Sequence, residues 1–214
     1  MSIPRVLLAD DHTLVLEGFR RLLEEHCELL GTAEDGRALI QAAERLQPDL
    51  VLLDISMPRL NGIDAARMLK RQHPELKLIF VTMHADPSYV NEAFKAGASG
   101  YLLKRSAAQE LIQAIQAVMK GDYYVTPLIT KDVISAFLTT GRPRIPAADD
   151  LTSRQREILQ LVAEGFSAKE IAGQLNLSHR TIEFHKAKIM EVLDLHTTAD
   201  LVKYAVAHGL VAAS

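Results

Sequence analysis

The sequence predicts an α/β domain followed by an all-α domain, because its hydrophobic pattern changes along the chain. Up to about residue 120, apolar runs of four or five residues alternate with stretches whose apolar residues recur at spacings of three and four. Such short continuous runs are typical of strands buried on both faces of a parallel sheet, and the other stretches are typical of helices. After residue 150 no strand-like run is evident, and four segments of helix length follow.

The first domain should be a flavodoxin-like, doubly wound sheet of five parallel strands, since strands that alternate with helices are joined by right-handed crossovers. The expected strands are residues 6–9, 29–33, 50–53, 78–82 and 100–103. Five helices are expected with them, and the clearest helical spacing lies in residues 14–23, 39–46, 65–69 and 111–119.

The second domain should contain four helices, each preceded by a hydroxyl side chain that can cap its first turn. The expected caps are Thr152, Ser167, Ser178 and either Thr197 or Thr198. Gln155 stands three residues after Thr152, as in a capping box, and Gly165 is placed to end the first of these helices.

The stretch between the two patterns is predicted to be a linker, because residues 140–150 combine prolines, a glycine and polar side chains. We therefore expect a first domain at residues 1–122, a linker at 123–149 and a second domain at 150–214. A short helix around residues 131–138 is left open.

Composition favours a cytoplasmic protein without a membrane partner. The chain has 214 residues, a net charge of −3, no run near the roughly 18–20 apolar residues that span a bilayer, and no basic-then-apolar signal peptide. Its single cysteine, Cys27, cannot form an intramolecular disulfide, which agrees with a reducing cytosol. The net charge argues mildly against a nucleic-acid partner.

Polar side chains stand where four of the predicted strands end. Asp10 and Asp11 follow the first strand, Asp54 the third and Lys104 the fifth, and Thr82 ends the fourth. Ligands of an open α/β sheet bind beyond the carboxyl ends of its strands. Because three converging carboxylates repel one another unless a cation lies among them, this pattern predicts a Mg²⁺ site.

Asp54 is the candidate phosphoryl acceptor, since a carboxylate can attack phosphorus to give an aspartyl-phosphate. Lys104 can meet a phosphate oxygen, Thr82 can hydrogen-bond the new phosphoryl oxygen, and Tyr101 lies on the adjacent strand, where it can respond. Each residue alone has an ordinary explanation: Asp11 as a helix cap, Lys104 as surface, Tyr101 as core. Their place at one sheet edge favours a site.

Five separated motifs resemble the receiver domain of bacterial response regulators, over about residues 3–120. They are Asp10-Asp11, Asp54 within Leu53-Asp54-Ile55-Ser56-Met57-Pro58, Asn61-Gly62, Val81-Thr82 and Gly100-Tyr101-Leu102-Leu103-Lys104. One departure is Arg105, which stands where many receivers have proline.

The resemblance implies that a cognate histidine kinase phosphorylates Asp54. It implies a Mg²⁺ ion held by Asp11, Asp54 and the backbone carbonyl of Ser56, with Asp10 acting through water. It also makes Thr82 and Tyr101 a switch pair and Lys104 the phosphate contact.

The C-terminal segments have the lengths of a helix-turn-helix: residues 167–175, a tight connection at 176–177, and a second helix at 178–190. Ile182, Ile189 and Leu193 form a stripe for the core, and residues 178–190 carry a charge of +2.

A recognition helix reads base edges with its early residues and one face. The candidate DNA contacts are Lys169, Ser178, Arg180, Thr181, Glu183, Phe184, His185, Lys186 and Lys188. The alternative is an ordinary charged helix face, because residues 151–214 hold seven basic and seven acidic side chains.

This tail is similar to the LuxR-type helix-turn-helix over nearly all of residues 150–212. The matching stretches are 151–159, 163–165, 169–172 and 177–185. A receiver followed by this tail is the layout of the NarL/FixJ family, which implies a transcriptional regulator of a two-component system that binds double-stranded DNA and is not an enzyme. Glu183 departs from the family, in which lysine is frequent at this position.

The family resemblance also implies a homodimer, formed through the last helix at about residues 198–208 when the protein is phosphorylated or on DNA. Leu201, Val202, Ala205 and Val206 offer a small apolar face for this contact, and the alternative is that they only complete the bundle core.

Two other functions are open from the residues alone. The first is a magnesium phosphatase or phosphotransferase that passes through an aspartyl-phosphate. Such enzymes often carry a second aspartate two residues after the nucleophile, where this chain has Ser56. The second is a binding module whose tail contacts protein in place of DNA.

Overall fold

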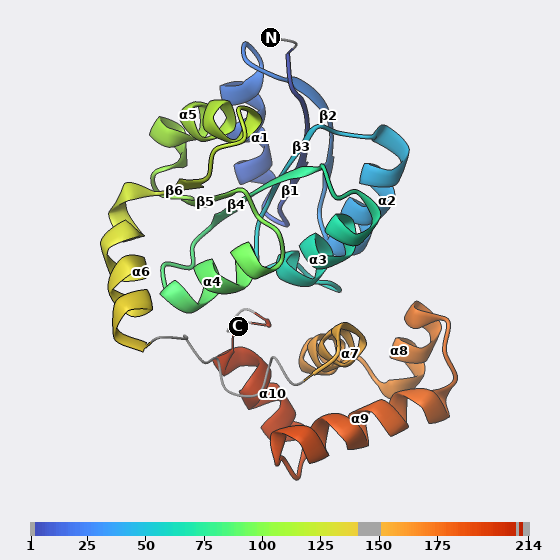
Figure 1. The fold of residues 1–214 in the computed structure, drawn as a ribbon. Helices are drawn as coiled ribbons and strands as arrows, with labels where there is room; N and C mark the ends of the chain where they lie inside the picture. Colours follow the sequence, from blue (N-terminus) through green and yellow to red (C-terminus); the bar gives the residue numbers. More distant parts are fainter. Residues whose placement is uncertain (1–2, 141–150, 209, 212–214) are drawn as a thin grey trace. The chain divides into compact units, whose positions relative to one another are not determined.

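The computed structural model describes residues 3–140, 151–208 and 210–211, with the backbone alone for residues 136–140. These residues form two compact units, one with the sheet and six helices and one with four helices (Figure 1). The α/β and all-α fold classes predicted from the sequence are thereby confirmed. The boundaries predicted at residues 122 and 150 stay a prediction.

The sheet of the first unit has six parallel strands in the order β2-β1-β3-β4-β5-β6. The strands are β1 (Arg5–Ala9), β2 (Glu28–Ala33), β3 (Leu50–Leu53), β4 (Lys77–Thr82), β5 (Gly100–Leu103) and β6 (Tyr124–Val125). The first five are the predicted strands. The strand order reverses between β1 and β3, which makes the carboxyl ends of these two strands the expected ligand position.

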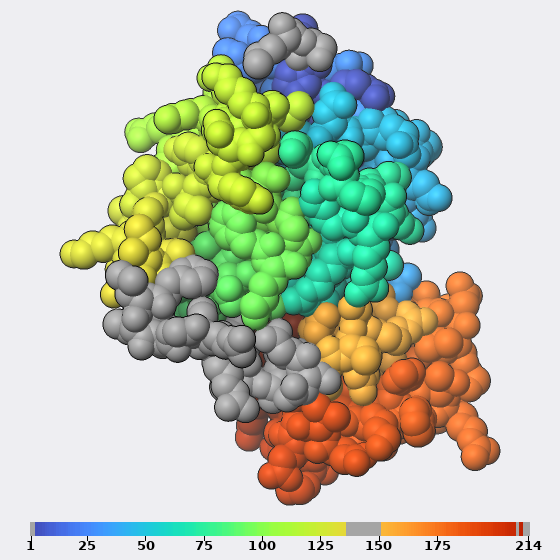
Figure 2. All heavy atoms as spheres, viewed as in Figure 1, coloured from blue at the N-terminus to red at the C-terminus, as the bar shows by residue number. Residues whose placement is uncertain are grey.

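Five helices cover the two faces of this sheet. They are α1 (Thr13–Leu23), α2 (Gly36–Leu46), α3 (Gly62–Gln72), α4 (Pro87–Lys95) and α5 (Ala107–Met119). Helices α1 and α5 lie together on one face, and α2, α3 and α4 lie on the other (Figure 1). In the space-filling view, α3 in teal and α4 in green lie side by side on the surface (Figure 2).

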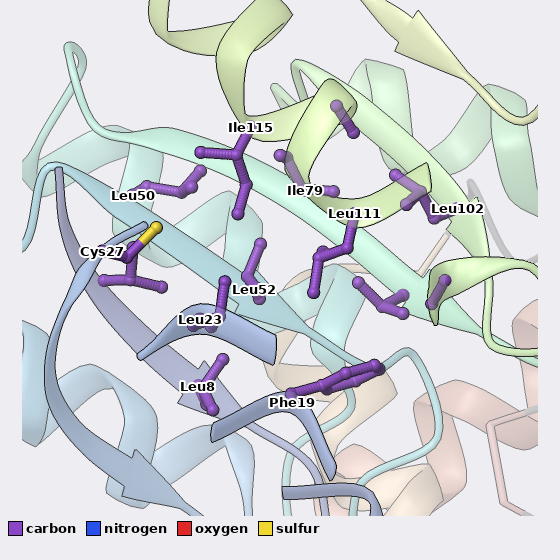
Figure 3. Packing of buried hydrophobic residues seen from close by; sticks show 14 of the residues in the cluster. Leu8, Phe19, Leu23, Cys27, Leu50, Leu52, Ile79, Leu102, Leu111 and Ile115 are labelled. Carbon is purple, nitrogen blue, oxygen red and sulfur yellow. The ribbon is translucent and has the colours of Figure 1, made fainter. Parts of the chain in front are cut away.

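The core on the α1 and α5 side explains why these helices pack there. Leu8, Leu50, Leu52, Ile79 and Leu102 point from the strands toward α1 and α5 (Figure 3). Phe19 and Leu23 of α1 and Leu111 and Ile115 of α5 meet them, at helical spacings of four residues. Removing such side chains from water is the main stabilising contribution to a domain of this size.

Part of the segment predicted as a linker has regular structure. Strand β6 pairs with β5, and α6 (Pro127–Thr140) follows it, so the helix left open around residues 131–138 is present and longer. The fully buried Thr126 holds this segment to β5, because its backbone N–H donates to Tyr101 O and its hydroxyl accepts from Leu103 N. Residues 141–149 of the predicted linker lie outside the described residues.

The second unit contains α7 (Ser153–Ala163), α8 (Ala168–Leu175), α9 (His179–Leu193) and α10 (Thr198–Ala207) around one apolar core. The predicted caps are confirmed, since Thr152, Ser167, Ser178 and Thr197 each accept a hydrogen bond from the first turn of the helix that follows. Asn176, in the left-handed conformation at φ 52°, allows the tight connection between α8 and α9.

Within the described parts of the chain, no helix combines the length and the apolar character needed to cross a membrane.

Candidate functional site

The strand register brings Asp10 and Asp54 together at the reversal of strand order. Ala9 of β1 pairs with Leu53 of β3, so the residues that follow these two strands are neighbours. The backbone N–H of Asp54 donates to Ala9 O at 2.9 Å, which fixes this register. Both carboxylates are buried, Asp10 at 2% and Asp54 at 4% exposure. Buried carboxylates need positive or hydrogen-bonding partners.

Lys104 supplies that partner. Its Nζ lies 2.7 Å from Asp10 Oδ2 and 2.8 Å from Asp54 Oδ2. Burial raises the pKa of Asp10, although hydrogen bonds from Lys104 and from the His12 backbone oppose the change. Burial alone would lower the pKa of Lys104, but its hydrogen bonds to both carboxylates raise it above the ordinary value. The ammonium group of Lys104 therefore lies between the two buried carboxylates of Asp10 and Asp54.

An acidic pocket surrounds this pair. Asp10, Asp11, His12 and Asp54 each offer one ligand atom, and these atoms all lie within 4.8 Å of one another. Carboxylate oxygens are the hard ligands that Mg²⁺ prefers, so this donor set fits the ion, as expected for the receiver domain that the sequence resembles. The carbonyl of Ser56, which was expected as a further ligand, stays a prediction.

His12 was missed as a member of this cluster, although it directly follows Asp10-Asp11 in the sequence. Its Nδ1 lies 2.8 Å from Asp11 Oδ1 and 3.1 Å from Asp10 Oδ1. Its backbone N–H donates to Asp10 Oδ1 at 2.9 Å. His12 therefore helps to orient the two acids at the start of α1.

Thr82 and Tyr101 are both buried, at the end of β4 and in β5. The Tyr101 hydroxyl donates to the carbonyl of His84 at 2.9 Å, and the Thr82 hydroxyl accepts from His84 N at 3.4 Å. Burial raises the pKa of Tyr101, so this hydroxyl stays protonated and able to donate. The two residues of the expected switch pair thus bind the same loop after β4.

His84 is a second residue that the sequence reasoning missed. Its Nε2 lies 2.8 Å from Ser56 Oγ, and its ring stacks on Tyr89 with centroids 4.2 Å apart. Burial lowers the pKa of His84, which favours the neutral ring. The available signal was its position two residues beyond Thr82, at the same sheet edge. His84 connects the loop after β3 to the loop after β4.

The loop after β3 folds closely back on Asp54. Gly62 N donates to Ile55 O at 2.8 Å, and Ile55 N donates to Asp54 Oδ1 at 2.6 Å. A Cβ atom at Gly62 would lie 1.9 Å from the backbone oxygen of Asp54. This position therefore requires glycine, and α3 starts directly beside Asp54.

The second unit presents α9 as the second helix of a helix-turn-helix. Its core stripe is confirmed, because Ile182 and Ile189 are fully buried and Leu193 packs against the same core. Six of the nine candidate DNA contacts are exposed: Lys169, Ser178, Arg180, Glu183, Phe184 and Lys188. The other three, Thr181, His185 and Lys186, are partly exposed.

The charge of α9 is lower than the sequence predicted. The helix runs on to Leu193 and takes in Glu191, so three basic side chains stand against two acidic ones and the charge is +1, not +2. Lys188 Nζ lies 2.7 Å from Glu191, and Lys186 Nζ lies 3.7 Å from Glu183. Two of the three basic side chains therefore already have acidic partners on the same helix.

Two models of known protein families match this chain, one in each unit. A model described as "Response regulator receiver domain" matches residues 6–116, and one described as "Bacterial regulatory proteins, luxR family" matches residues 149–205. The chain belongs to the NarL/FixJ family of response regulators. It is a two-component response regulator that binds DNA to regulate transcription, not an enzyme. The phosphatase and the protein-binding module are thereby set aside.

Relatives of this response regulator match it over nearly all of its length. The transcriptional regulatory protein MctR of Rhizobium johnstonii is 35% identical over 97% of this chain and 95% of its own length. The oxygen regulatory protein NreC of Staphylococcus carnosus is 35% identical over 97% and 99%. A structure of the response regulator RcsB of Salmonella typhimurium has a TM-score of 0.65 at 32% identity, over 97% of this chain and 98% of that one.

The apolar residues of the last helix, α10, lie partly in the core and partly at the surface. Leu201 and Ala205 of α10 are fully buried in the core of the second unit. Val202 is partly exposed, and Val206 is 38% exposed. Of the four residues predicted to form an apolar face, two therefore lie in the core and two are at least partly exposed.

Proposed function

We propose that Asp54 accepts a phosphoryl group from a cognate histidine kinase and that this modification controls how the chain binds DNA. The observation that carries the proposal is the buried Asp54 carboxylate beside Lys104 and within 4.8 Å of two further acids. Phosphoryl transfer needs positioning and charge neutralisation more than covalent help from the protein, and this arrangement supplies both.

In this step a phosphoryl group passes from the imidazole of the kinase to the carboxylate of Asp54. An Asp54 carboxylate oxygen forms a bond to phosphorus while the bond from phosphorus to the donor's imidazole nitrogen breaks, with no change in oxidation state. Asp11, Asp54 and the Ser56 carbonyl would hold a Mg²⁺ ion, with Asp10 reaching it through water, and the bound ion would neutralise part of the phosphoryl charge. Lys104, already hydrogen-bonded to Asp54, contacts a phosphoryl oxygen in the product.

The phosphoryl group changes the loops that Thr82 and Tyr101 hold. The Thr82 hydroxyl turns toward a phosphoryl oxygen and donates a hydrogen bond to it. This rotation breaks the hydrogen bond that the hydroxyl accepts from the backbone N–H of His84. Tyr101, whose hydroxyl binds the His84 carbonyl, shifts with that loop. The resulting change at the surface of β4, α4 and β5 biases a two-state equilibrium.

The DNA contact is assigned to α9 and the start of α8, through the nine candidate residues. We propose that two copies bind together, since dimers of RcsB bound to DNA have been described and Val202 and Val206 leave an apolar strip on α10. A single α9 with a charge of +1 is a weak electrostatic ligand for DNA, so pairing of two such helices is expected.

The direct test of the acceptor is labelling by a small phosphodonor such as acetyl phosphate in the presence of Mg²⁺. The wild type should incorporate one phosphoryl group and the Asp54→Asn variant none. Asp49→Asn, at the other end of the same strand, is the matched control and should label like the wild type. Robust labelling of Asp54→Asn would refute the assignment.

A further inference from the structure

Phe184 is a large aromatic side chain left in water on α9. It is 60% exposed, and its ring meets the ring of the next residue, His185, edge-on at a centroid distance of 5.9 Å. The core residues Ile182 and Ile189 lie on the opposite side of the helix, so the bundle does not use the Phe184 ring. A single exposed apolar side chain is common on a protein surface. Phe184 stands out because it lies on the helix that is proposed to contact DNA, among the candidate contact residues.

The neighbours of Phe184 show which kind of ligand this is. Arg180 one turn before, and Ala187 and Lys188 one turn after, lie on the same face of α9, and all three are exposed. The face therefore consists of an apolar centre, Phe184 with Ala187, between the cationic side chains of Arg180 and Lys188, of which Lys188 also pairs with Glu191. A protein surface with an acidic rim and a DNA groove both suit such cations. We take the groove as the ligand because the chain belongs to a DNA-binding family, and the groove also presents one kind of apolar group between its two rows of phosphates.

That group is the C5-methyl of thymine in the major groove. Each base pair presents a distinct pattern there, and apolar side chains such as Ala and Phe contact the thymine methyl. Cations at either end of the helix face can reach the phosphates that flank the groove. Glu183, which lies 3.7 Å from Lys186, is held to one side of this apolar centre.

We propose that Phe184 reads a thymine in the DNA site of this regulator by packing its ring on the C5-methyl group. The inference rests on the proposed contact between α9 and DNA. It makes the position opposite Phe184 selective for thymine over cytosine, because cytosine carries no methyl group and also replaces an acceptor by a donor.

The test uses the full chain treated with acetyl phosphate and Mg²⁺, and DNA duplexes that it enriches from a library with a random centre. Each thymine of the enriched sequence is then replaced by uracil, which removes the methyl group and keeps the base pair. At one position this replacement should weaken binding of the wild type about fourfold, the value of one buried methyl group. The same replacement should leave binding of Phe184→Ala unchanged.

Two further variants make the result specific. Phe184→Leu keeps an apolar contact and should retain part of the methyl effect. Val192→Ala removes another exposed apolar side chain of α9, at 39% exposure, and should retain all of it. Both Phe184 variants should keep the wild-type circular dichroism, because the ring lies outside the core.

Two results would overturn the inference in different ways. If duplexes are enriched but no thymine shows a methyl effect that depends on residue 184, the reading by Phe184 is wrong and the DNA contact of α9 stands. The reading is equally wrong if Phe184→Ala alters only self-association. If no duplex is enriched at all, the proposed DNA contact fails and the inference fails with it.

Discussion

At the scale of single residues, Lys104 neutralises the two buried carboxylates of the candidate site. One ammonium group bridges Asp10 and Asp54, and the three side chains come from three different strand ends. This juxtaposition was predictable from the sequence, because parallel strands place their carboxyl ends at one edge. The contacts of His12 and His84 were not predictable. A histidine next to a motif can equally be an ordinary surface residue, and its partners become visible only from distances in the structure.

Cys27 offers a prediction at the residue scale. It is buried in the core between α1 and α5, and burial raises the pKa of its thiol from 9.0 to about 11. A thiol that ionises more easily in the unfolded chain makes stability fall as pH rises from about 9 toward 11, by at most about 1.4 kcal/mol per pH unit.

Urea unfolding between pH 8 and pH 11 measures this contribution, as the difference between the wild type and Cys27→Ala. The variant should be less stable at pH 8 by roughly 1–2 kcal/mol because it leaves a small cavity, and this deficit should shrink at higher pH. A deficit that is independent of pH would contradict the assigned thiol pKa.

At the scale of elements, the sequence patterns recovered the five main strands and the caps of α7 to α10. They missed β6, because Tyr124–Val125 is too short for any alternation to be visible and is held by pairing with β5. They ended α9 a turn early, since Val192 and Leu193 continue the helix to Asp194, where the left-handed φ of 53° ends it. Such ends depend on tertiary contacts more than on local sequence.

The turn from β3 into α3 gives a prediction for an element. Gly62→Ala would place a Cβ 1.9 Å from the Asp54 backbone oxygen, so the loop must move. We expect a loss of about 2–4 kcal/mol of stability and slower labelling of Asp54 by acetyl phosphate.

Gly18→Ala in α1 is the matched control, because a Cβ there meets no atom within 4 Å. This exposed helix position should gain about 0.5–1 kcal/mol and label normally. Thermal unfolding and labelling rates check both variants. Equal effects of the two substitutions would show that the close approach at Asp54 is unimportant.

A third prediction concerns the basic residues of α9. Lys186→Ala and Lys188→Ala should each weaken DNA binding and reduce the dependence of log Kd on log salt by about one, if each meets a phosphate. Lys203→Ala, on the exposed side of α10, is the control and should leave the slope unchanged. An unchanged slope for both α9 variants would remove them from the interface.

At the scale of the whole molecule, the net charge led to a wrong expectation about the binding partner. The total of −3 argues mildly against nucleic acid, yet the family to which the chain belongs binds DNA. Residues 1–120 hold 14 basic and 16 acidic side chains, including Asp10, Asp11 and Asp54 of the acidic pocket, whereas residues 151–214 are balanced at seven and seven. Charge averaged over two domains therefore conceals an acidic site and a modestly basic helix.

The central claim is that phosphorylation of Asp54 controls DNA binding, and affinity for an enriched duplex tests it most directly. Fluorescence anisotropy should show that acetyl phosphate with Mg²⁺ lowers the Kd of the wild type at least about tenfold, a coupling of about 1.4 kcal/mol. The Kd of Asp54→Asn should not respond. An equal response of both proteins, or no response of the wild type despite full labelling, would contradict the claim.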